Sequence, residues 1–360
     1  MRTIKYCSLV AAASLAFASS LAPADEPDGY AGIAPLFASD AALDVTIDAP
    51  IETLMDVRPD KAYLKGRFIY IEADGTERML GLKLRTRGNY RRDPEHCNFA
   101  PILLNFKKGA VPGTLFAGQD KLKLVTHCQT HVLGYEQNLL REYLAYRFLQ
   151  ELTSISYGTR LFRVTYTDAT EGKPLTRFGF VIENDKAVAK RNGVKTVKTR
   201  SLRETEIDAK LQNLINVFQY MIGNTEYSLV NPEPNKNCCH NSDVLSKDRG
   251  PPYLPLAFDF DFSGLVNAPY AEPNPRYPIP NVRQRFYRGL CAANDMLPET
   301  LLVFIDKKDD FYRIVDELEP ATKRTKKQVR SYLESFYEEI TDPNMVQEQL
   351  VAKCYEPEAK

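Results

Sequence analysis

The sequence of 360 residues lacks tryptophan and has only four histidines. It also lacks an excess of charge of either sign, since 47 basic residues balance 47 acidic ones, so charge gives no reason to expect nucleic acid or an anionic membrane as a partner. The motif G-x-S-x-G is absent and no Ser-His-Asp arrangement can be placed, which argues against an α/β-hydrolase. No G-x-G-x-x-G follows an expected strand, so a dinucleotide-binding sheet is disfavoured.

Apolar runs long enough to cross a membrane are lacking as well, and no integral membrane segment is expected. The uncharged run Ser8–Leu21 is too short for a stable span. Arg2 and Lys5 precede it, and the small-x-small sequence Ala-Pro-Ala follows at 22–24. Because this order is typical of a secretory signal peptide, we expect residues 1–24 to be cleaved and the mature protein to be periplasmic or secreted.

Cysteine occurs in a number that fits export. Cys7 lies within the expected signal peptide, which leaves six cysteines: Cys97, Cys128, Cys238, Cys239, Cys291 and Cys354. An even number in an exported chain suggests up to three disulfides. We favour a Cys97–Cys128 bond, because both residues flank the same cluster of expected strands. A zinc site is disfavoured, since the adjacent pairs His96-Cys97, His127-Cys128 and Cys239-His240 lack the C-x-x-C or H-x-x-x-H spacing of zinc ligands, and adjacent residues rarely bind one metal.

The order of the expected elements indicates a segregated α+β protein. Alternating residues on both sides of Asp74-Gly75 predict a β-hairpin, and apolar residues at three- and four-residue steps predict helices over 134–152 and 204–222. The expected divisions are a signal peptide (1–24), a leader (25–42), a strand-rich N-lobe with one helix (43–183), a C-lobe with the polar loops (184–296) and a charged helical extension (297–360). This order predicts a bilobal protein-kinase-like fold with a strand-rich N-lobe and a helical C-lobe.

Polar loops after the second helix hold the residues best suited to chemistry. Asp259 and Asp261 end an apolar strand, and Asn231 and Asn241 lie in the loop before it. Carboxylate and amide oxygens, completed by phosphate and water, are typical ligands of Mg²⁺ at phosphoryl-transfer sites. Glu226, upstream of them, could orient an attacking hydroxyl, as in kinases. In the structural alternative, the two aspartates only end a strand and cap a turn.

Several stretches together resemble the CotH-like (spore coat protein H) family of exported, atypical protein kinases. They are LRTRGNY at 84–90, YEQNLLREYLAYRFLQELT at 135–153, RFGFVIENDKAV at 177–188, MIGNTEYS at 221–228, CCHNSDVL at 238–245 and LAFDFDFSGLV at 256–266. The resemblance spans about residues 65–290. The order of these short motifs is more specific than any one of them.

The resemblance implies Mg²⁺- and ATP-dependent phosphoryl transfer to Ser or Thr of exported proteins. Residue by residue it assigns Glu226 as the catalytic carboxylate; Asn241 (or Asn231), Asp259 and Asp261 as metal ligands; Lys123 (or Lys107) as the phosphate-binding lysine; Glu142 (or Glu136) as the ion-pair partner of that lysine; and Arg87 and Glu183 as further nucleotide-binding residues.

Two departures from the family pattern leave other functions open. The catalytic position carries Glu226 where Asp is expected, and the extra methylene shifts the geometry enough to reduce the rate. A strict Gly-rich loop is missing, and Gly109, Gly113 and Gly118 replace it only loosely. The alternative is therefore a catalytically impaired pseudokinase that acts as an envelope binding or assembly protein. A weaker alternative is a metal-dependent hydrolase that uses the same aspartates.

Overall fold

The computed structural model describes residues 32–168, 173–233 and 236–357. The expected signal peptide and Cys7 therefore lie outside the described residues. No helix of the described segments is both long and apolar enough to cross a membrane. Three disulfides join Cys97 to Cys128, Cys238 to Cys239, and Cys291 to Cys354. The predicted Cys97–Cys128 bond is confirmed.

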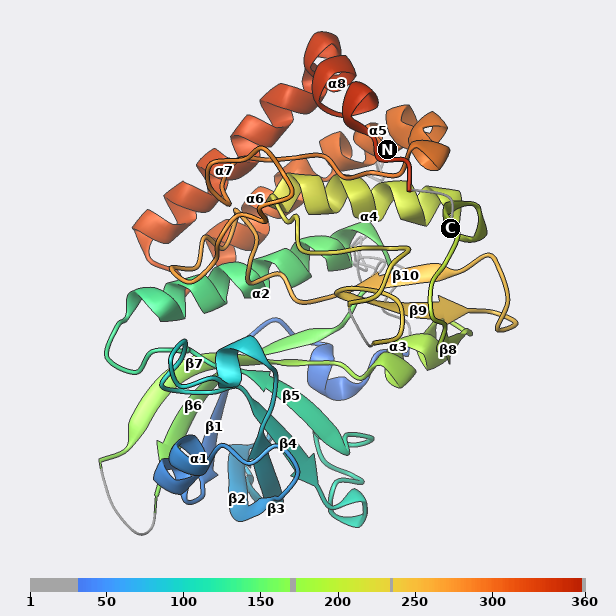
Figure 1. Ribbon diagram of the computed structural model, residues 1–360. Helices are drawn as coiled ribbons and strands as arrows, with labels where there is room; N and C mark the ends of the chain where they lie inside the picture. Colours follow the sequence, from blue (N-terminus) through green and yellow to red (C-terminus); the bar gives the residue numbers. More distant parts are fainter. Residues whose placement is uncertain (1–31, 169–172, 234–235, 358–360) are drawn as a thin grey trace, which may run out of the picture.

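Seven strands form a closed barrel in the first half of the chain (Figure 1). They are β1 (Leu43–Asp48), β2 (Leu64–Ile71), β3 (Glu77–Thr86), β4 (Ile102–Phe106), β5 (Lys121–Val125), β6 (Thr159–Thr167) and β7 (Leu175–Ile182), in the spatial order β1-β2-β3-β4-β5-β7-β6. The predicted hairpin is confirmed, because β2 and β3 pair antiparallel across the turn that contains Gly75, whose φ is +85°. Alternate residues of β3 and β4 are buried, as expected of strands with one face on a core.

The closure of this barrel shows that the expected fold class is wrong. β1 pairs in parallel with β6, from Leu43 opposite Phe162 to Asp48 opposite Thr167, and antiparallel with β2. These two pairings remove the free edges that an open sheet would keep. The protein is therefore a closed mixed β-barrel with eight helices in the described residues, and not a bilobal kinase-like fold with a separate N-lobe sheet.

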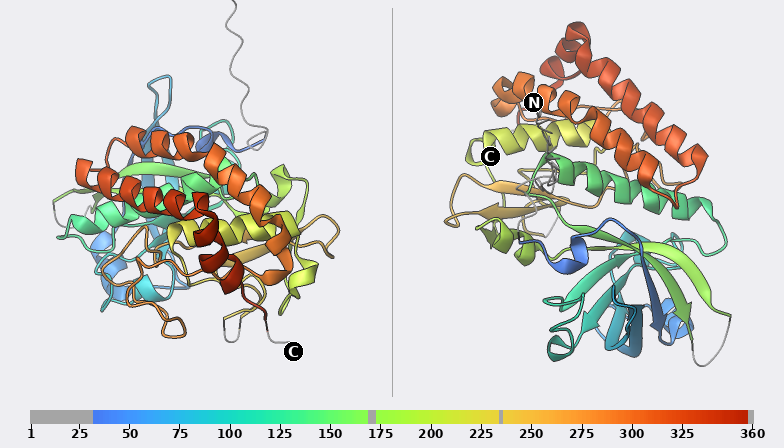
Figure 2. Two further views of the ribbon diagram at one scale, coloured as in Figure 1. Left: turned by 90° about the horizontal axis from the view of Figure 1, so that it is seen from above. Right: turned by 180° about the vertical axis from the view of Figure 1, so that it is seen from behind.

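The helices lie mostly on one side of the barrel, together with a small second sheet (Figures 1 and 2). The helices are α1 (Ile51–Val57), α2 (Gly134–Leu152), α3 (Asp185–Arg191), α4 (Ala209–Ile222), α5 (Leu297–Asp306), α6 (Lys308–Glu317), α7 (Lys323–Thr341) and α8 (Pro343–Gln349), and the sheet has the order β10-β9-β8, with β8 (Lys195–Val197), β9 (Ser242–Ser246) and β10 (Leu254–Ala257). The predicted helix over 134–152 is confirmed as α2. The second predicted helix begins later, at Ala209, because the Asp208 side chain caps it by accepting a hydrogen bond from the Leu211 N–H.

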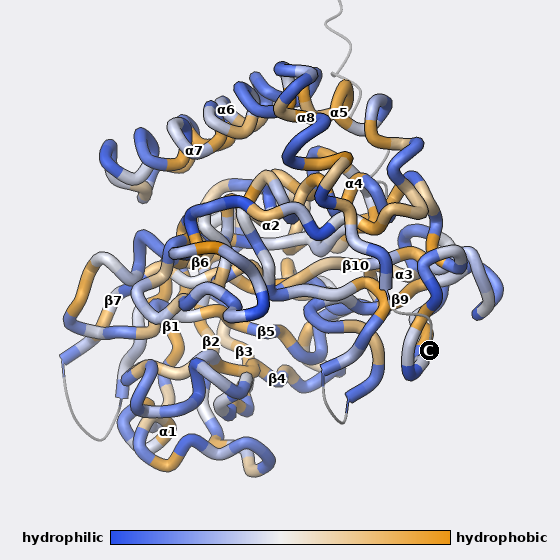
Figure 3. The backbone as a smooth tube through the Cα atoms, turned by 45° about the horizontal axis from the view of Figure 1, so that its top comes forward, coloured by the Kyte–Doolittle hydropathy of each residue, from blue (hydrophilic) through white to orange (hydrophobic). Residues whose placement is uncertain are grey.

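Two hydrophobic cores follow from this arrangement. One fills the barrel, and the other joins α2, α4 and the C-terminal helices to the small sheet. α2 contacts β6 and β7 on one side and α4, α6 and α7 on the other, so it lies between the barrel and the outer helices. α7 is hydrophilic along much of its length, with hydrophobic positions between (Figure 3), as expected of a helix with one face on a core.

Candidate functional site

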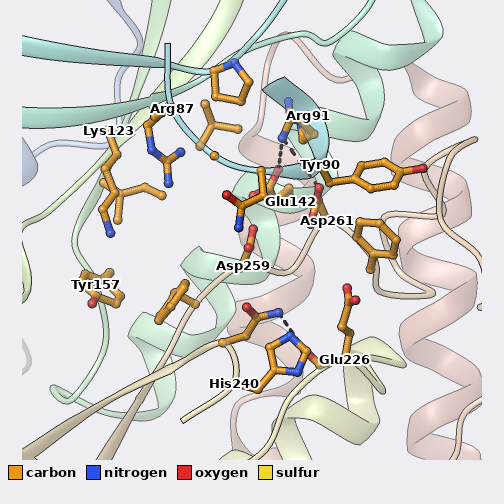
Figure 4. Close-up of a pocket in the computed structure, with 18 of the residues that line it drawn as sticks. Arg87, Tyr90, Arg91, Lys123, Glu142, Tyr157, Glu226, His240, Asp259 and Asp261 are labelled. Atoms are coloured by element: carbon orange, nitrogen blue, oxygen red, sulfur yellow. Dashed lines mark hydrogen bonds and ion pairs between the residues drawn. The ribbon is translucent and has the colours of Figure 1, made fainter. Parts of the chain in front are cut away.

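A cavity of 510 Å³ opens between the barrel and the helical part of the molecule (Figure 4). Its lining comes from the segment after β3, from β5 and α2, and from the loops that follow α4 and β10. Of the residues assigned from the sequence, seven line it: Arg87, Lys123, Glu142, Glu226, Asn241, Asp259 and Asp261. The structure thus brings together residues that are separated by up to about half of the chain.

The barrel side contributes three cationic side chains to this cavity, Arg87, Arg91 and Lys123, and two of them face it without an ion pair. Lys123 lies in β5, where its backbone is opposite Leu103 of β4 and Ile182 of β7. Arg87 follows β3, and its N–H donates to the Pro101 carbonyl at 2.9 Å. In the part of the chain that the structure describes, neither side chain has a carboxylate within 4.0 Å. Both cations are therefore available to an anionic ligand.

Burial makes these two cations costly in the absence of such a ligand. Burial lowers the pKa of Lys123, and the neighbouring Arg87 lowers it further. Burial also lowers the pKa of Arg87, although Asp259 opposes this effect. The Lys123 ammonium lies 5.5 Å from the ring centroid of Phe258 and 6.0 Å from that of Tyr157, which gives it a partial aromatic environment.

The loops of the helical part contribute four carboxylates to the lining: Glu233, which pairs with Lys236, and the three described next. Glu226 points into the cavity from the loop after α4, and burial, followed by repulsion from Asp261 and Asp259, raises its pKa to about 7. Asp261 is buried, and burial and the Asp259 charge raise its pKa to about 6. Asp259 is exposed, and its N–H donates to the Tyr146 hydroxyl at 2.9 Å. The cavity therefore holds more negative charge on this side than the protein itself neutralises.

Asn241 connects the loop that carries Glu226 to the strand end that carries Asp259. The side-chain amide of Asn241 donates to the backbone carbonyl of Glu226 at 2.8 Å, and the backbone carbonyl of Asn241 accepts from the Phe258 N–H at 3.1 Å. The Glu226 N–H donates to the Asn224 side chain at 2.9 Å. These bonds fix the backbone of Glu226 and leave its carboxylate free to act in the cavity.

The ion pair expected between Lys123 and Glu142 is replaced by another. Arg91 lies 3.3 Å from Glu142 and 3.9 Å from Asp261, while the Tyr270 hydroxyl donates to Asp261 at 2.9 Å. Burial raises the pKa of Glu142, and Arg91 counteracts this. Sequence reasoning missed Arg91, and the only available signal was its position directly after the LRTRGNY motif.

The remaining assigned residues lie away from the cavity lining. Lys107 is exposed after β4, and Asn231 makes only local bonds in its loop. Glu183 is buried in an ion pair with Arg191 at 3.2 Å, and Glu136 lies 3.8 Å from Arg177. The structure therefore places Lys123 and Asn241, and not Lys107 and Asn231, at the cavity. The loosely matching glycines Gly109, Gly113 and Gly118 do not line it either.

The oxygen ligands at the cavity suit a magnesium ion that arrives together with a phosphate ligand. Within the described segments, no three His, Cys, Asp or Glu side chains gather into a group that could hold a metal ion. Magnesium, however, is usually held by one or two carboxylates together with phosphate oxygens and water. Asp259, Asp261 and the free oxygen of the Asn241 amide fit an ion that arrives with a nucleotide. Such an ion would also relieve the repulsion that raises the pKa of Glu226 and Asp261.

Comparison with protein-family models and with curated proteins gives no match for this chain. The resemblance to the CotH-like kinases therefore stays a prediction, and the function has to be argued from the cavity.

Proposed function

We propose that the cavity binds a nucleoside triphosphate with Mg²⁺ and transfers its terminal phosphoryl group to a Ser or Thr hydroxyl of an exported protein, as a CotH-like kinase would. The observation that supports this most is the opposition of two unpaired cations, Arg87 and Lys123, to three carboxylates across one cavity. Polyphosphate needs cations, and the metal that accompanies it needs carboxylates, so one ligand satisfies both sides.

Each side chain then has a definite task. Arg87 and Lys123 bind phosphate oxygens and lose the energetic cost of being buried without a partner. Asp259, Asp261 and Asn241 would hold the metal, which would neutralise charge on the transferred group. Glu226, whose pKa is about 7, accepts the proton of the acceptor hydroxyl at its carboxylate. Arg91 keeps Asp261 and Glu142 in place by bridging them.

A binding protein without catalysis is the second candidate. One specific observation favours it: Glu142 pairs with Arg91, which leaves Lys123 without the carboxylate partner that positions the phosphate-binding lysine in active kinases. Glu226, which is longer than the Asp expected at this position, also favours the binding protein. In this case the cavity binds nucleotide or another polyanion and no transfer follows.

The decisive test uses the mature chain, residues 25–360, purified with its disulfides intact. Labelled ATP and Mg²⁺ are supplied with the protein itself and with generic acceptor proteins, and transfer to Ser or Thr is measured. We expect labelling by the wild type, loss of labelling in Asp259→Asn and Glu226→Gln, and no change in the control Lys107→Met.

Thermal denaturation with and without ATP and Mg²⁺ separates the candidates. Stabilisation of about 2.7 kcal/mol is expected at a ligand concentration of 100 times Kd. Stabilisation without labelling would support the binding protein, and absence of both would refute nucleotide binding at this cavity.

A further inference from the structure

A tyrosine of the C-terminal helix α7 reaches between two glycines that border the candidate site. Gly223 ends α4 with a φ of +65°, and Gly264 follows Asp261 by three residues. A Cβ atom at Gly223 would lie 2.1 Å from the Tyr332 hydroxyl oxygen, and one at Gly264 would lie 2.4 Å from it. Both positions must therefore lack a side chain while Tyr332 occupies this gap.

These glycines belong to the two segments that carry the carboxylates. The Gly264 N–H donates to the Gly223 carbonyl at 3.0 Å, and the Leu265 N–H donates to the Ile222 carbonyl at 2.9 Å. Glu226 follows this junction on one segment, and Asp261 precedes it on the other. The distance between Glu226 and the two aspartates therefore depends on how the segments are held together at this point.

Tyr332 is itself fixed from several directions. It is 5% exposed, and its hydroxyl donates to the Arg283 carbonyl at 3.1 Å. The Arg285 guanidinium lies 4.1 Å from the centre of its ring. Arg285 also donates to the Met221 carbonyl at 3.2 Å and lies 3.3 Å from Glu339 of α7. The Arg285 side chain thus connects the end of α4 to α7, the helix that carries Tyr332.

We infer that Tyr332 is a positioning residue, which holds the Glu226 loop and the Asp259–Asp261 strand end at their working separation from a helix outside the cavity. This inference rests on the proposed function for its catalytic consequence. It makes α7 part of the reaction apparatus, although α7 contributes no residue to the cavity lining. Since a displacement of about 1 Å can cost a hundredfold in rate, a small change at Tyr332 should be visible in kcat.

The test introduces a methyl group against the Tyr332 hydroxyl. Gly223→Ala creates this clash, and Gly193→Ala is the matched control, because Gly193 has the same φ of +65° and no atom within 4 Å of its added Cβ. We expect Gly223→Ala to lower kcat at least tenfold with the KM for ATP unchanged, since Arg87 and Lys123 are untouched. In a Tyr332→Phe background, which removes the clashing oxygen, the loss should shrink severalfold.

A second readout does not require activity. The Gly264 and Leu265 N–H groups hold the two segments together by donating to the Gly223 and Ile222 carbonyls. Separation of the segments should break these bonds and speed hydrogen exchange at both amides, as measured by NMR on the nucleotide-free protein. Tyr332→Leu fills the same buried place without reaching the glycines, so it should give the same faster exchange without a clash.

The outcomes separate the two proposals. If the wild type transfers no phosphoryl group, the proposed function fails, and hydrogen exchange at Gly264 and Leu265 still decides the role of Tyr332. If Gly223→Ala and Tyr332→Leu leave this exchange as slow as in the wild type, or if Gly223→Ala behaves as Gly193→Ala does, Tyr332 has no positioning role.

Discussion

The two sides of the cavity are built by different kinds of structure. On the barrel side, Lys123 lies within a strand that is hydrogen-bonded on both edges, and Arg87 directly follows another strand. On the other side, the acidic residues lie in loops. Two residues on that side, Asn241 and Asp259, are non-glycine residues with positive φ, at 51° and 65°. The cationic side is thus fixed by regular pairing, and the acidic side by individual bonds.

This difference shows that the two sides of the cavity lower the stability of the protein in different ways. Positive φ costs roughly 1 kcal/mol or more in a non-glycine residue and persists when surrounding contacts impose it. Asn and Asp tolerate the conformation better than other residues do. The cost on the barrel side is instead the partial burial of two cations that have no ion pair among the described residues. Mutations on the two sides should therefore have different effects on activity, binding and stability.

The largest effect is expected on the acidic side, at Asp259. Asp259→Asn keeps the shape and the tolerance of positive φ but removes the charge that acts on Arg87 and that would bind the proposed metal. We expect phosphoryl transfer to fall about 10²–10³-fold, as for the loss of one stabilising group in a preorganised site. Initial rates at saturating ATP and Mg²⁺ measure this. The exposed Asp248→Asn is the control. Equal activity of the two variants would show that Asp259 has no role in phosphoryl transfer.

On the barrel side we expect a loss of binding together with a gain in stability. Lys123→Met and Arg87→Met should each remove one of the proposed charge-assisted bonds to phosphate, worth about 1.5–3 kcal/mol, which corresponds to a Kd for nucleotide raised about 10–100-fold. Because each cation is half-buried without an ion pair among the described residues, the nucleotide-free variants should be no less stable than the wild type.

Calorimetric titration and thermal denaturation test both parts of this expectation. Lys107→Met, outside the cavity, should change neither quantity. A variant that loses stability without losing affinity would show that the cation has a structural role.

Local patterns predicted the parts of this structure that depend on neighbouring residues. The turn at Gly75 and the apolar spacing of α2 are properties of short segments, and the structure has both. The closure of the barrel depends on the pairing of β1 with β6, more than 100 residues later, and no local pattern contains it. The sequence therefore predicted strands correctly and the fold that they form incorrectly.

The same reasoning explains the outcome at the site. Glu226, Asn231, Asn241, Asp259 and Asp261 were chosen by residue type and position after an element, and all of them except Asn231 line one cavity. The partner of Glu142 could not be chosen in this way. A buried carboxylate pairs with the cation that reaches it, and the turn after β3 brings Arg91 nearer than Lys123. Contacts between side chains from separate elements can be predicted only when the three-dimensional arrangement of those elements is known.

The smallest expected effect is on the pH dependence of stability, and it concerns Glu226 on the acidic side of the cavity. Relative to its ordinary value of 4.5, the pKa of Glu226 is raised to about 7, so the folded protein binds this proton more tightly than the unfolded chain does. The stability contributed by this group is present at low pH and is lost as pH rises from about 4.5 to 7. In Glu226→Gln this part of the pH dependence should vanish, which makes the variant more stable than the wild type at pH 8 by about 1 kcal/mol, after allowance for solvent screening.

Denaturation midpoints between pH 4 and pH 8 measure this, with the exposed Glu95→Gln as the control. Mg²⁺ with nucleotide should shrink the difference between Glu226→Gln and the wild type, because a bound cation offsets the repulsion from Asp261 and Asp259. If the wild type and Glu226→Gln depend on pH in the same way, Glu226 is not held in an uncompensated acidic environment. The two sides of the cavity would then not differ in the way that their structures indicate.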